Sequence, residues 1–423
     1  MIKRILLGFA ALVVIGCIGL AALAYRPAID PIAAAPSFSP TLVAQGEVLA
    51  AGGYCATCHT TRGGQAYAGG YAMKTGFGTL YSTNITPDRD TGIGTWSEAA
   101  FRRALHEGVA RDGSHLFPAL PYDHFTKLTD ADVSALYAYV MTRPAVKATP
   151  PANELPFPLN VRALQAGWKL LFFKSGRYVA DGAHDAQWNR GAYLADALGH
   201  CGACHTPRNA LGAEQASKAY AGAAIDGWIA PALTAANPAP IAWSTPELAS
   251  YLTTGISQYH GTAAGPMAAV VHDGLAKLSP ADQQAVTVYI ESLGGGDGRA
   301  AQAAPVLARA FAVRAGNDPD SRLFTAACAS CHYGTGANPL RPAIALNTAV
   351  TLDEPTNLIR VILYGISAKD GAPGIVMPGF SGFSDTDIAR LAAHIRSTQT
   401  DKPAWGDLQQ KVAAVRAAGR GES

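Results

Sequence analysis

The pentapeptide Cys-Ala-Thr-Cys-His at residues 55–59 decides the organisation of this 423-residue chain, because the pattern occurs three times. The other two copies are CGACH at 201–205 and CASCH at 328–332. Successive histidines of the pattern are 146 and 127 residues apart, close to the roughly 150 residues of one ordinary domain. We therefore identify an internal repeat and expect one compact domain for each copy.

Features at fixed distances downstream extend the repeat. In each copy a glycine ends a helix-like stretch, and the residue twelve positions later is leucine in the first copy and methionine in the other two. The glycines are Gly108, Gly255 and Gly365, and the later residues are Leu120, Met267 and Met377. The copies are therefore related over much more than the pentapeptide.

Each copy also ends in a stretch with helical spacing of its apolar residues and a matching start. The starts are TDAD from Thr129, SPAD from Ser279 and SDTD from Ser384. A Ser or Thr with an acid three residues later resembles a capping box. Shorter helical stretches precede each pentapeptide, and no sustained strand alternation is visible. The sequence therefore predicts a mainly α fold.

The chemistry lies in the C-x-x-C-H pattern itself. Two cysteines three positions apart, followed at once by histidine, fall on one helical turn. The two sulfurs can form thioethers with the vinyl groups of a haem, while the imidazole binds the iron. We expect three covalently bound haem c groups. The predicted attachment residues are Cys55, Cys58, Cys201, Cys204, Cys328 and Cys331, and the predicted iron ligands are His59, His205 and His332.

Two other uses of paired cysteines compete with this interpretation. A structural zinc needs four ligands at one centre, whereas here the pairs are in separate copies, each with its own histidine. A redox-active dithiol of the thioredoxin type lacks its β-α-β setting. Three copies in one chain favour the haem.

Met267 and Met377 are the predicted sixth ligands of the second and third irons, because a thioether favours reduced iron and suits electron transfer. The first copy has Leu120 at this position, and leucine cannot bind iron. The first iron is therefore left open or is bound by another side chain nearby. The candidates are Met73, His115 and His124.

Residues 5–25 carry no charge and would span about 32 Å as a helix, enough to cross a bilayer core of about 30 Å. Lys3 and Arg4 precede this run, so the positive-inside rule places the remainder outside the cytoplasm. Cleavage after Ala22-Leu23-Ala24 and lipidation of Cys17 are alternatives. We expect a bacterial cytoplasmic membrane location with the haem domains in the periplasm.

The composition limits the possible partners. Charged residues make up 15% of the chain, against about 25% in ordinary soluble domains, and 33 Lys and Arg nearly balance 31 Asp and Glu. Nucleic acid is therefore not expected as a partner. The expected segments are an anchor (1–26), a spacer (27–40), three haem domains (41–146, 182–295 and 316–400), two linkers (147–181 and 296–315) and a tail (401–423).

Longer motifs add a family resemblance. The chain after the anchor resembles the three-haem cytochrome c subunits of bacterial periplasmic dehydrogenases, such as quinoprotein alcohol dehydrogenase and gluconate 2-dehydrogenase. The motifs that carry the resemblance are GTLYSTNITPD (78–88), FPALPYDHFTKLTDADVSALYAYVMTRP (117–144), AGWKLLFF (166–173), WNRGAYLADALGHCGACHTPRNALGA (188–213) and HGTAAGPM (260–267). The resemblance implies three tandem class I cytochrome c domains.

PALPYDHF looks more like the branch that serves molybdenum hydroxylases of the nicotinate dehydrogenase kind. The resemblance implies an electron-transfer subunit, not catalytic alone, that carries electrons from a dehydrogenase subunit to ubiquinone or a terminal oxidase in the membrane. Service to a quinoprotein alcohol or flavoprotein gluconate dehydrogenase is an alternative. Two other classes are a peroxidase-like haem enzyme that uses an open first iron and a structural metal-binding protein.

Overall fold

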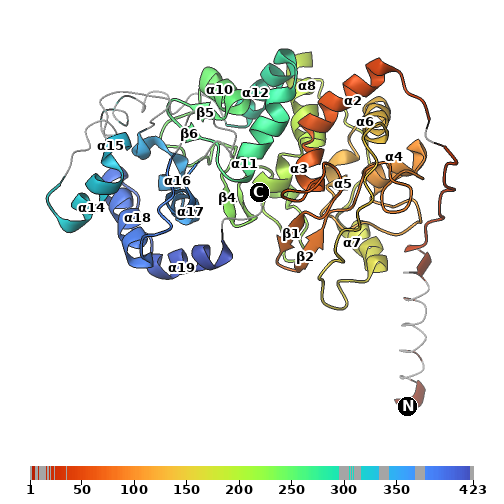
Figure 1. The fold of residues 1–423 in the computed structure, drawn as a ribbon, viewed down its shortest axis with the longest axis horizontal. Helices are drawn as coiled ribbons and strands as arrows, with labels where there is room; N and C mark the ends of the chain where they lie inside the picture. Colours follow the sequence, from red (N-terminus) through yellow and green to blue (C-terminus); the bar gives the residue numbers. More distant parts are fainter. Residues whose placement is uncertain are drawn as a thin grey trace. The chain divides into compact units, whose positions relative to one another are not determined.

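The computed structural model describes residues 24–34, 36–294, 316–332, 343–366 and 377–419, with scattered positions before 24 and between 304 and 308 (Figure 1). The chain divides into two compact units. The first comprises Met1–Ala180 with Asp196–His200, and the second comprises Asp181–Ala195 with Cys201–Ser423. The first pentapeptide lies in the first unit and the other two in the second, so the three predicted haem domains remain a prediction.

The first unit is built mainly of helices, with one short hairpin. Its elements are α2 (Pro40–Gly52), α3 (Cys55–His59), β1 (Ala72–Thr75), β2 (Gly78–Tyr81), α4 (Glu98–Glu107), α5 (Tyr122–Phe125), α6 (Asp130–Met141) and α7 (Gln165–Phe172). Helix α2 packs closely on α6. A Cβ atom at Gly46 would overlap the backbone carbonyl of Ala135, so the glycine sets how closely these two helices approach.

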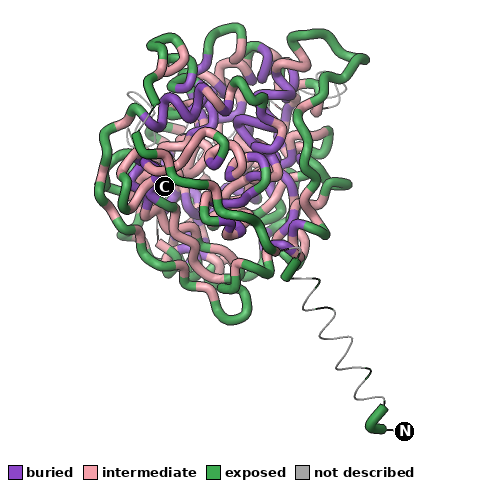
Figure 2. Tube along the Cα trace, turned by 90° about the vertical axis from the view of Figure 1, so that its right-hand side faces the viewer, coloured by how far each residue is buried: buried purple, intermediate pink, exposed green. Residues whose placement is uncertain are grey.

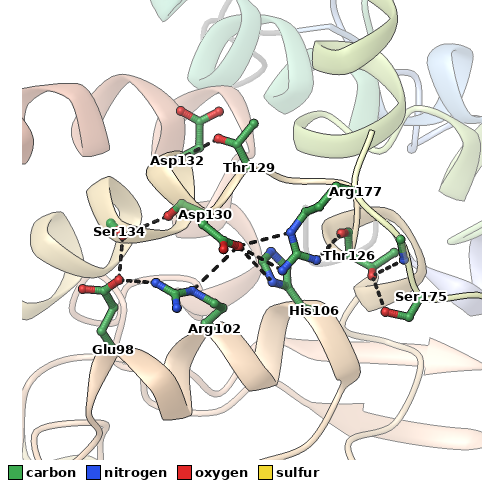
Figure 3. A network of polar contacts seen from close by, with 11 residues as sticks. Glu98, Arg102, His106, Thr126, Thr129, Asp130, Asp132, Ser134, Ser175 and Arg177 are labelled. Carbon is green, nitrogen blue, oxygen red and sulfur yellow. Dashed lines mark hydrogen bonds and ion pairs between the residues drawn. The ribbon is translucent and has the colours of Figure 1, made fainter. Parts of the chain in front are cut away.

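A polar network joins three parts of the first unit (Figure 3). Asp130, at the start of α6, forms an ion pair with Arg177 at 2.9 Å. Arg102 and His106 of α4 point toward the same carboxylate, each at 3.9 Å. Because Arg177 follows α7, the network ties the segment after α7 to α4 and α6.

The second unit repeats the same plan. Its elements up to residue 293 are α8 (Ala186–Tyr193), α9 (Gly202–His205), β3 (Ala223–Ile225), β4 (Trp228–Ala230), α10 (Thr245–Thr254), β5 (Ile256–Ser257), β6 (Gly261–Thr262), α11 (Pro266–Ala269) and α12 (Pro280–Leu293). Helix α8 packs on α12 as α2 packs on α6. A Cβ atom at Gly191 would overlap the carbonyl of Ala285, so the same glycine contact recurs.

The third copy of the repeat completes the second unit. Its elements are α14 (Pro319–Ala327), α15 (Ala329–His332), α16 (Thr348–Thr351), α17 (Thr356–Tyr364), α18 (Asp385–Gln399) and α19 (Leu408–Ala418). Phe324, Ile359 and Ile388 form a buried core with Val412 of α19. The segment expected as a tail thus contributes a helix to the core. Figure 2 shows buried and exposed segments along the chain trace.

The predicted helix starts are confirmed. The side chains of Thr129, Ser279 and Ser384 each accept a hydrogen bond from the backbone N–H three residues later, at 3.1 to 3.2 Å. The mainly α fold is confirmed as well. The three short antiparallel hairpins, β1 with β2, β3 with β4 and β5 with β6, were not predicted.

The predicted anchor lies for most of its length outside the described residues, and so does Cys17. In the part of the chain that the structure describes, no helix is both long enough and apolar enough to cross a membrane. The linker predicted at 296–315 also lies almost entirely outside the described residues.

Candidate haem-binding sites

The six cysteines of the three pentapeptides form no disulfide in the described parts of the chain. Burial raises the pKa of Cys55 to about 12, and the neighbouring Cys58 adds to the rise. Burial also raises the pKa of Cys204 and Cys328 to about 11. Reactive dithiols need the opposite, a lowered thiol pKa, so Cys55, Cys204 and Cys328 lack the property of a redox-active thiol.

The arrangement around the cysteines does not suit zinc either. A zinc site brings four ligand atoms to one centre. Among the described residues, no group of three His, Cys, Asp or Glu ligand atoms within 4.8 Å of one another includes a cysteine of the pentapeptides. Two thiols within one helical turn can instead each add to a vinyl group of one haem, which requires no metal centre shared by the two sulfurs.

His59 is held in a definite orientation at the end of α3. Its Nδ1 lies 2.7 Å from the backbone carbonyl of Thr83, so Nδ1 carries the proton and donates it. The lone pair is therefore on Nε2. Burial lowers the pKa of His59, which keeps the imidazole neutral, the form that binds a metal.

His205 has the same orientation at the end of α9. Its Nδ1 donates to the carbonyl of Pro231 at 2.7 Å, and burial lowers its pKa. Both histidines thus present a neutral Nε2 lone pair, as a proximal iron ligand requires. The donor set in both places fits a covalently attached haem.

The loop after each of these histidines has a shared geometry that the sequence analysis missed. The N–H of Gly69 donates to the carbonyl of His59 at 2.8 Å, and the N–H of Gly222 donates to that of His205 at 2.7 Å. Both glycines end the tripeptide Tyr-Ala-Gly, at 67–69 and 220–222. Their φ angles are 77° and 85°, which glycine adopts without the strain that a side chain would cause, so glycine is required at both positions. This shared tripeptide was the available signal.

The third site is described in part. Cys328 is buried and Cys331 is exposed, and His332 ends α15. Residues 333–342, which follow, lie outside the described residues. The predicted role of His332 therefore stays a prediction.

The two predicted methionine ligands lie in loops that their backbones fix. Met267 is the second residue of α11, which follows Gly265 at a φ of 56°. Met377 exchanges two backbone hydrogen bonds with Ile366, at 2.8 and 3.0 Å. This pairing places Met377 beside Gly365, the glycine from which its twelve-residue spacing was counted.

Leu120 lies just before α5 and is half-buried, and its carbonyl accepts a hydrogen bond from Tyr122 at 2.7 Å. His115 has both ring nitrogens in contact with other groups, at 3.0 Å each. Nε2 lies against the carbonyl of Ala24, and Nδ1 lies against the ammonium of Lys169. These two contacts leave His115 no lone pair for iron.

The other two candidates for the first iron have different settings. His124 is buried, with Nδ1 2.8 Å from the carbonyl of Asp196. Met73 lies in β1, opposite Leu80 of β2. His124 lies in α5, directly after Leu120, whereas Met73 lies in a separate hairpin.

The residues directly before the first two pentapeptides contact each other. Tyr54 and His200 have φ angles of 37° and 35°, which are rare for such large side chains. The hydroxyl of Tyr54 donates to the carbonyl of Gly199 at 2.8 Å and lies 2.9 Å from Nδ1 of His200. Each of these two residues is peptide-bonded to a predicted haem-attachment cysteine.

Comparison with known proteins adds the family. Residues 43–144 match the family described as "Cytochrome c", and residues 318–395 match "Cytochrome C oxidase, cbb3-type, subunit III". The chain is similar to a nicotinate dehydrogenase subunit of Pseudomonas putida, with 48% identity over 94% of this chain and 34% of that protein. It therefore spans about a third of that relative.

Two further relatives are matched over most of their length. The fructose dehydrogenase cytochrome subunit of Gluconobacter japonicus is 38% identical over 89% of this chain and 83% of that protein. The gluconate 2-dehydrogenase cytochrome c subunit of Pantoea cypripedii is 36% identical over 93% and 90%. The predicted resemblance is confirmed. Cytochrome c domains bind haem c covalently, so the chain carries covalent haem c.

Proposed function

Because the chain belongs to the family of cytochrome c subunits of dehydrogenase complexes, we propose that it conducts electrons through three haem c groups to the respiratory chain. The electrons come from a catalytic dehydrogenase subunit, and the acceptor is a quinone or a terminal oxidase. The observation that carries the proposal is the matched orientation of His59 and His205, together with the third pentapeptide at 328–332.

The residues have separate parts in this function. Bound haem iron supplies a one-electron couple. The two cysteines of each pentapeptide fix the haem to the chain, and the histidine binds the iron. The carbonyls of Thr83 and Pro231 hold the imidazole rings of His59 and His205 in place and keep the proton on Nδ1. Met267 and Met377 would bind the second and third irons through their thioether sulfurs.

The partner that we propose is a molybdenum hydroxylase of the nicotinate dehydrogenase kind. The 48% identity to a nicotinate dehydrogenase subunit supports this choice over a fructose, gluconate or quinone-dependent alcohol dehydrogenase partner, since the identities to those cytochrome subunits are 38%, 36% and 35%. We place the haem domains in the periplasm, anchored to the bacterial cytoplasmic membrane by residues 5–25. Purification of the native complex and identification of its large subunit would test the partner.

Haem stoichiometry tests the central proposal. A pyridine haemochrome assay on the full chain should give three haems per polypeptide, and replacing Cys328 and Cys331 with alanine should leave two. Cys17→Ser is the matched control, because Cys17 belongs to no pentapeptide. A native value of two that the Cys328→Ala, Cys331→Ala variant leaves unchanged would contradict the third haem.

Leu120 favours a second candidate, a first iron with an open position that binds small molecules. We expect carbon monoxide to bind one haem in the reduced native protein. Leu120→Met should abolish that binding and raise the intensity of the Met-to-iron absorption band from two haems per chain to three, with little effect on stability because the two side chains are close in volume. An intensity already equal to three haems in the native protein would show that another residue supplies the sulfur.

A further inference from the structure

Helix α7 and the segment before it expose an unusual amount of apolar surface. Leu170 and Leu171 of α7 are 68% and 69% exposed, and Phe157 is 81% exposed. Leu159, Val161 and Leu164 lie between them in the sequence and are also exposed. Single exposed apolar residues are normal, so what sets this segment apart is that six of its fifteen residues are both apolar and exposed.

The opposite face of α7 is fixed to the first unit. Ala166 and Lys169 are buried, and the Lys169 ammonium donates to the carbonyls of Glu107 and Gly108, each at 2.6 Å. Trp168 makes an edge contact with the buried ring of Tyr122. Moving Lys169 would break both hydrogen bonds and leave a buried ammonium without these partners, which costs free energy. The leucines therefore stay outward.

The end of the uncharged run 5–25 lies beside α7. One imidazole joins the two, because His115 contacts Lys169 through Nδ1 and the carbonyl of Ala24 through Nε2, each at 3.0 Å. The chain then stays on the first unit, where the N–H of Ile29 donates to the carbonyl of Arg111 at 2.8 Å. A bilayer that holds residues 5–25 would therefore lie close to α7.

The charges of this region suit an anionic lipid surface. Residues 155–180 contain four basic residues and no Asp or Glu. Of the four, Lys169 is buried and Arg177 pairs with Asp130, which leaves the exposed Lys174 and the half-buried Arg162. Arg26, which follows the uncharged run, is also exposed. Basic side chains next to exposed leucines favour the headgroup boundary of anionic membranes.

We propose that the exposed apolar residues of 157–171 rest in the headgroup boundary of an anionic bilayer. The surface acts as a second membrane contact beside the anchor, and it fixes the orientation of the first unit toward the membrane. The inference deepens the membrane location stated under the proposed function and rests on it. An acidic protein partner is the competing occupant, and the test separates the two.

The experiment uses the full chain in vesicles of phosphatidylcholine with phosphatidylglycerol. Leu171→Cys, Leu164→Cys and Val48→Cys, each with Cys17→Ser, carry a nitroxide spin label. Val48 is the matched control, an exposed aliphatic residue of α2, which Figure 1 shows at the opposite edge of the first unit from α7. Collision with oxygen reports lipid contact, and collision with a polar nickel complex reports water.

Labels at 171 and 164 should favour oxygen over nickel several-fold more than the label at 48. Equal nickel access at all three positions would overturn the proposal, with the anchor unaffected. Labels at 171 and 164 that lose nickel access only when the catalytic subunit is added would also overturn it and would identify a protein interface. Failure of the full chain to bind vesicles would overturn the membrane location and this surface together, while the haem count tests electron transfer separately.

Discussion

At the scale of single residues, Tyr54 and His200 form a strained pair directly beside two predicted haem-attachment cysteines. Both have left-handed backbones without being glycine, and such strain persists only where the surroundings hold it. Both occupy the same position of the repeat, directly before a pentapeptide. Their hydrogen bond therefore links two copies through equivalent residues.

Tyr54→Phe should lower the free energy of unfolding by about 1 to 3 kcal/mol, because it removes the hydroxyl that contacts Gly199 and His200 in a buried place. Guanidinium denaturation followed by circular dichroism would measure the loss. Tyr81→Phe is the control, because its hydroxyl bonds the exposed carboxylate of Glu154 and should matter little. Equal small effects in both variants would mean that the Tyr54 contact does not stabilise the fold.

His106 makes the stability of the first unit depend on pH. Burial, then the charge of Arg177, lowers its pKa to about 4, although the carboxylate of Asp130 opposes this and Arg102 adds to it. That carboxylate lies 3.9 Å from Nδ1, too far for a hydrogen bond that would hold a proton on the ring. Between pH 6.5 and 4 the unfolded chain takes up a proton that the folded chain does not, so stability falls as the pH falls.

His106→Leu should remove this dependence. From pH 8 to pH 5 the wild-type protein should lose about 2 kcal/mol more than the variant, from a shift of this size. Denaturant titrations at both pH values give the difference directly. The comparison at pH 8, where the ring is neutral in both states, controls for packing. Parallel losses in the two proteins would show that His106 is protonated in the folded state.

At the scale of elements, the helix interfaces depend on glycines. Gly46→Ala should destabilise the first unit by at least about 2 kcal/mol, because the new Cβ would meet the backbone of Ala135, which no rotamer change can relieve. Gly191→Ala should destabilise the second unit by a similar amount, because its Cβ would overlap the backbone carbonyl of Ala285. Gly176→Ala, with open space around it, should change stability by less than about 0.5 kcal/mol. Thermal unfolding of the three variants provides the test.

The elements that the sequence predicted are those with local signals. Thr129, Ser279 and Ser384 begin helices because a hydroxyl at that position satisfies a free backbone N–H, and this needs only neighbouring residues. Helix α19 was missed because it starts after Asp407 at a φ of 53°, without a side-chain cap. The hairpins were missed because strands of two to four residues carry too little alternation to detect.

In the candidate sites, too, residues that are adjacent in sequence could be predicted, whereas contacts that depend on the tertiary fold could not. The cysteines and histidines of the pentapeptides are adjacent in sequence, so their grouping could be predicted. The carbonyls of Thr83 and Pro231 are 24 and 26 residues from the histidines that they hold, and no side-chain chemistry marks a backbone acceptor. The engagement of His115 by Lys169 and Ala24 is likewise a product of the tertiary fold.

At the scale of the whole molecule, Asn357 joins the second and third copies within one unit. Its side-chain amide forms hydrogen bonds with the backbone of β4, as a neighbouring strand would. The amide of Asn357 in α17 accepts from the N–H of Ile229 and donates to its carbonyl, each at 2.8 Å. Arg360 donates to the carbonyl of Gly227 at 2.6 Å. Together they cover the free edge of β4. Two residues 128 positions apart share this contact, which no sequence pattern indicates.

Asn357→Leu should loosen the second copy although the change is in the third. It leaves the N–H and carbonyl of Ile229 without their partner at a cost of about 2 kcal/mol. Strand β4 leads directly into Pro231, whose carbonyl orients His205, so amide hydrogen exchange should speed up over 228–233 as well as over α17. Mass spectrometry of peptic peptides would measure both, with exposed Gln409→Leu as the control. Faster exchange confined to α17 would mean that the third copy does not support the site of His205, and that the two copies share a unit without sharing stability.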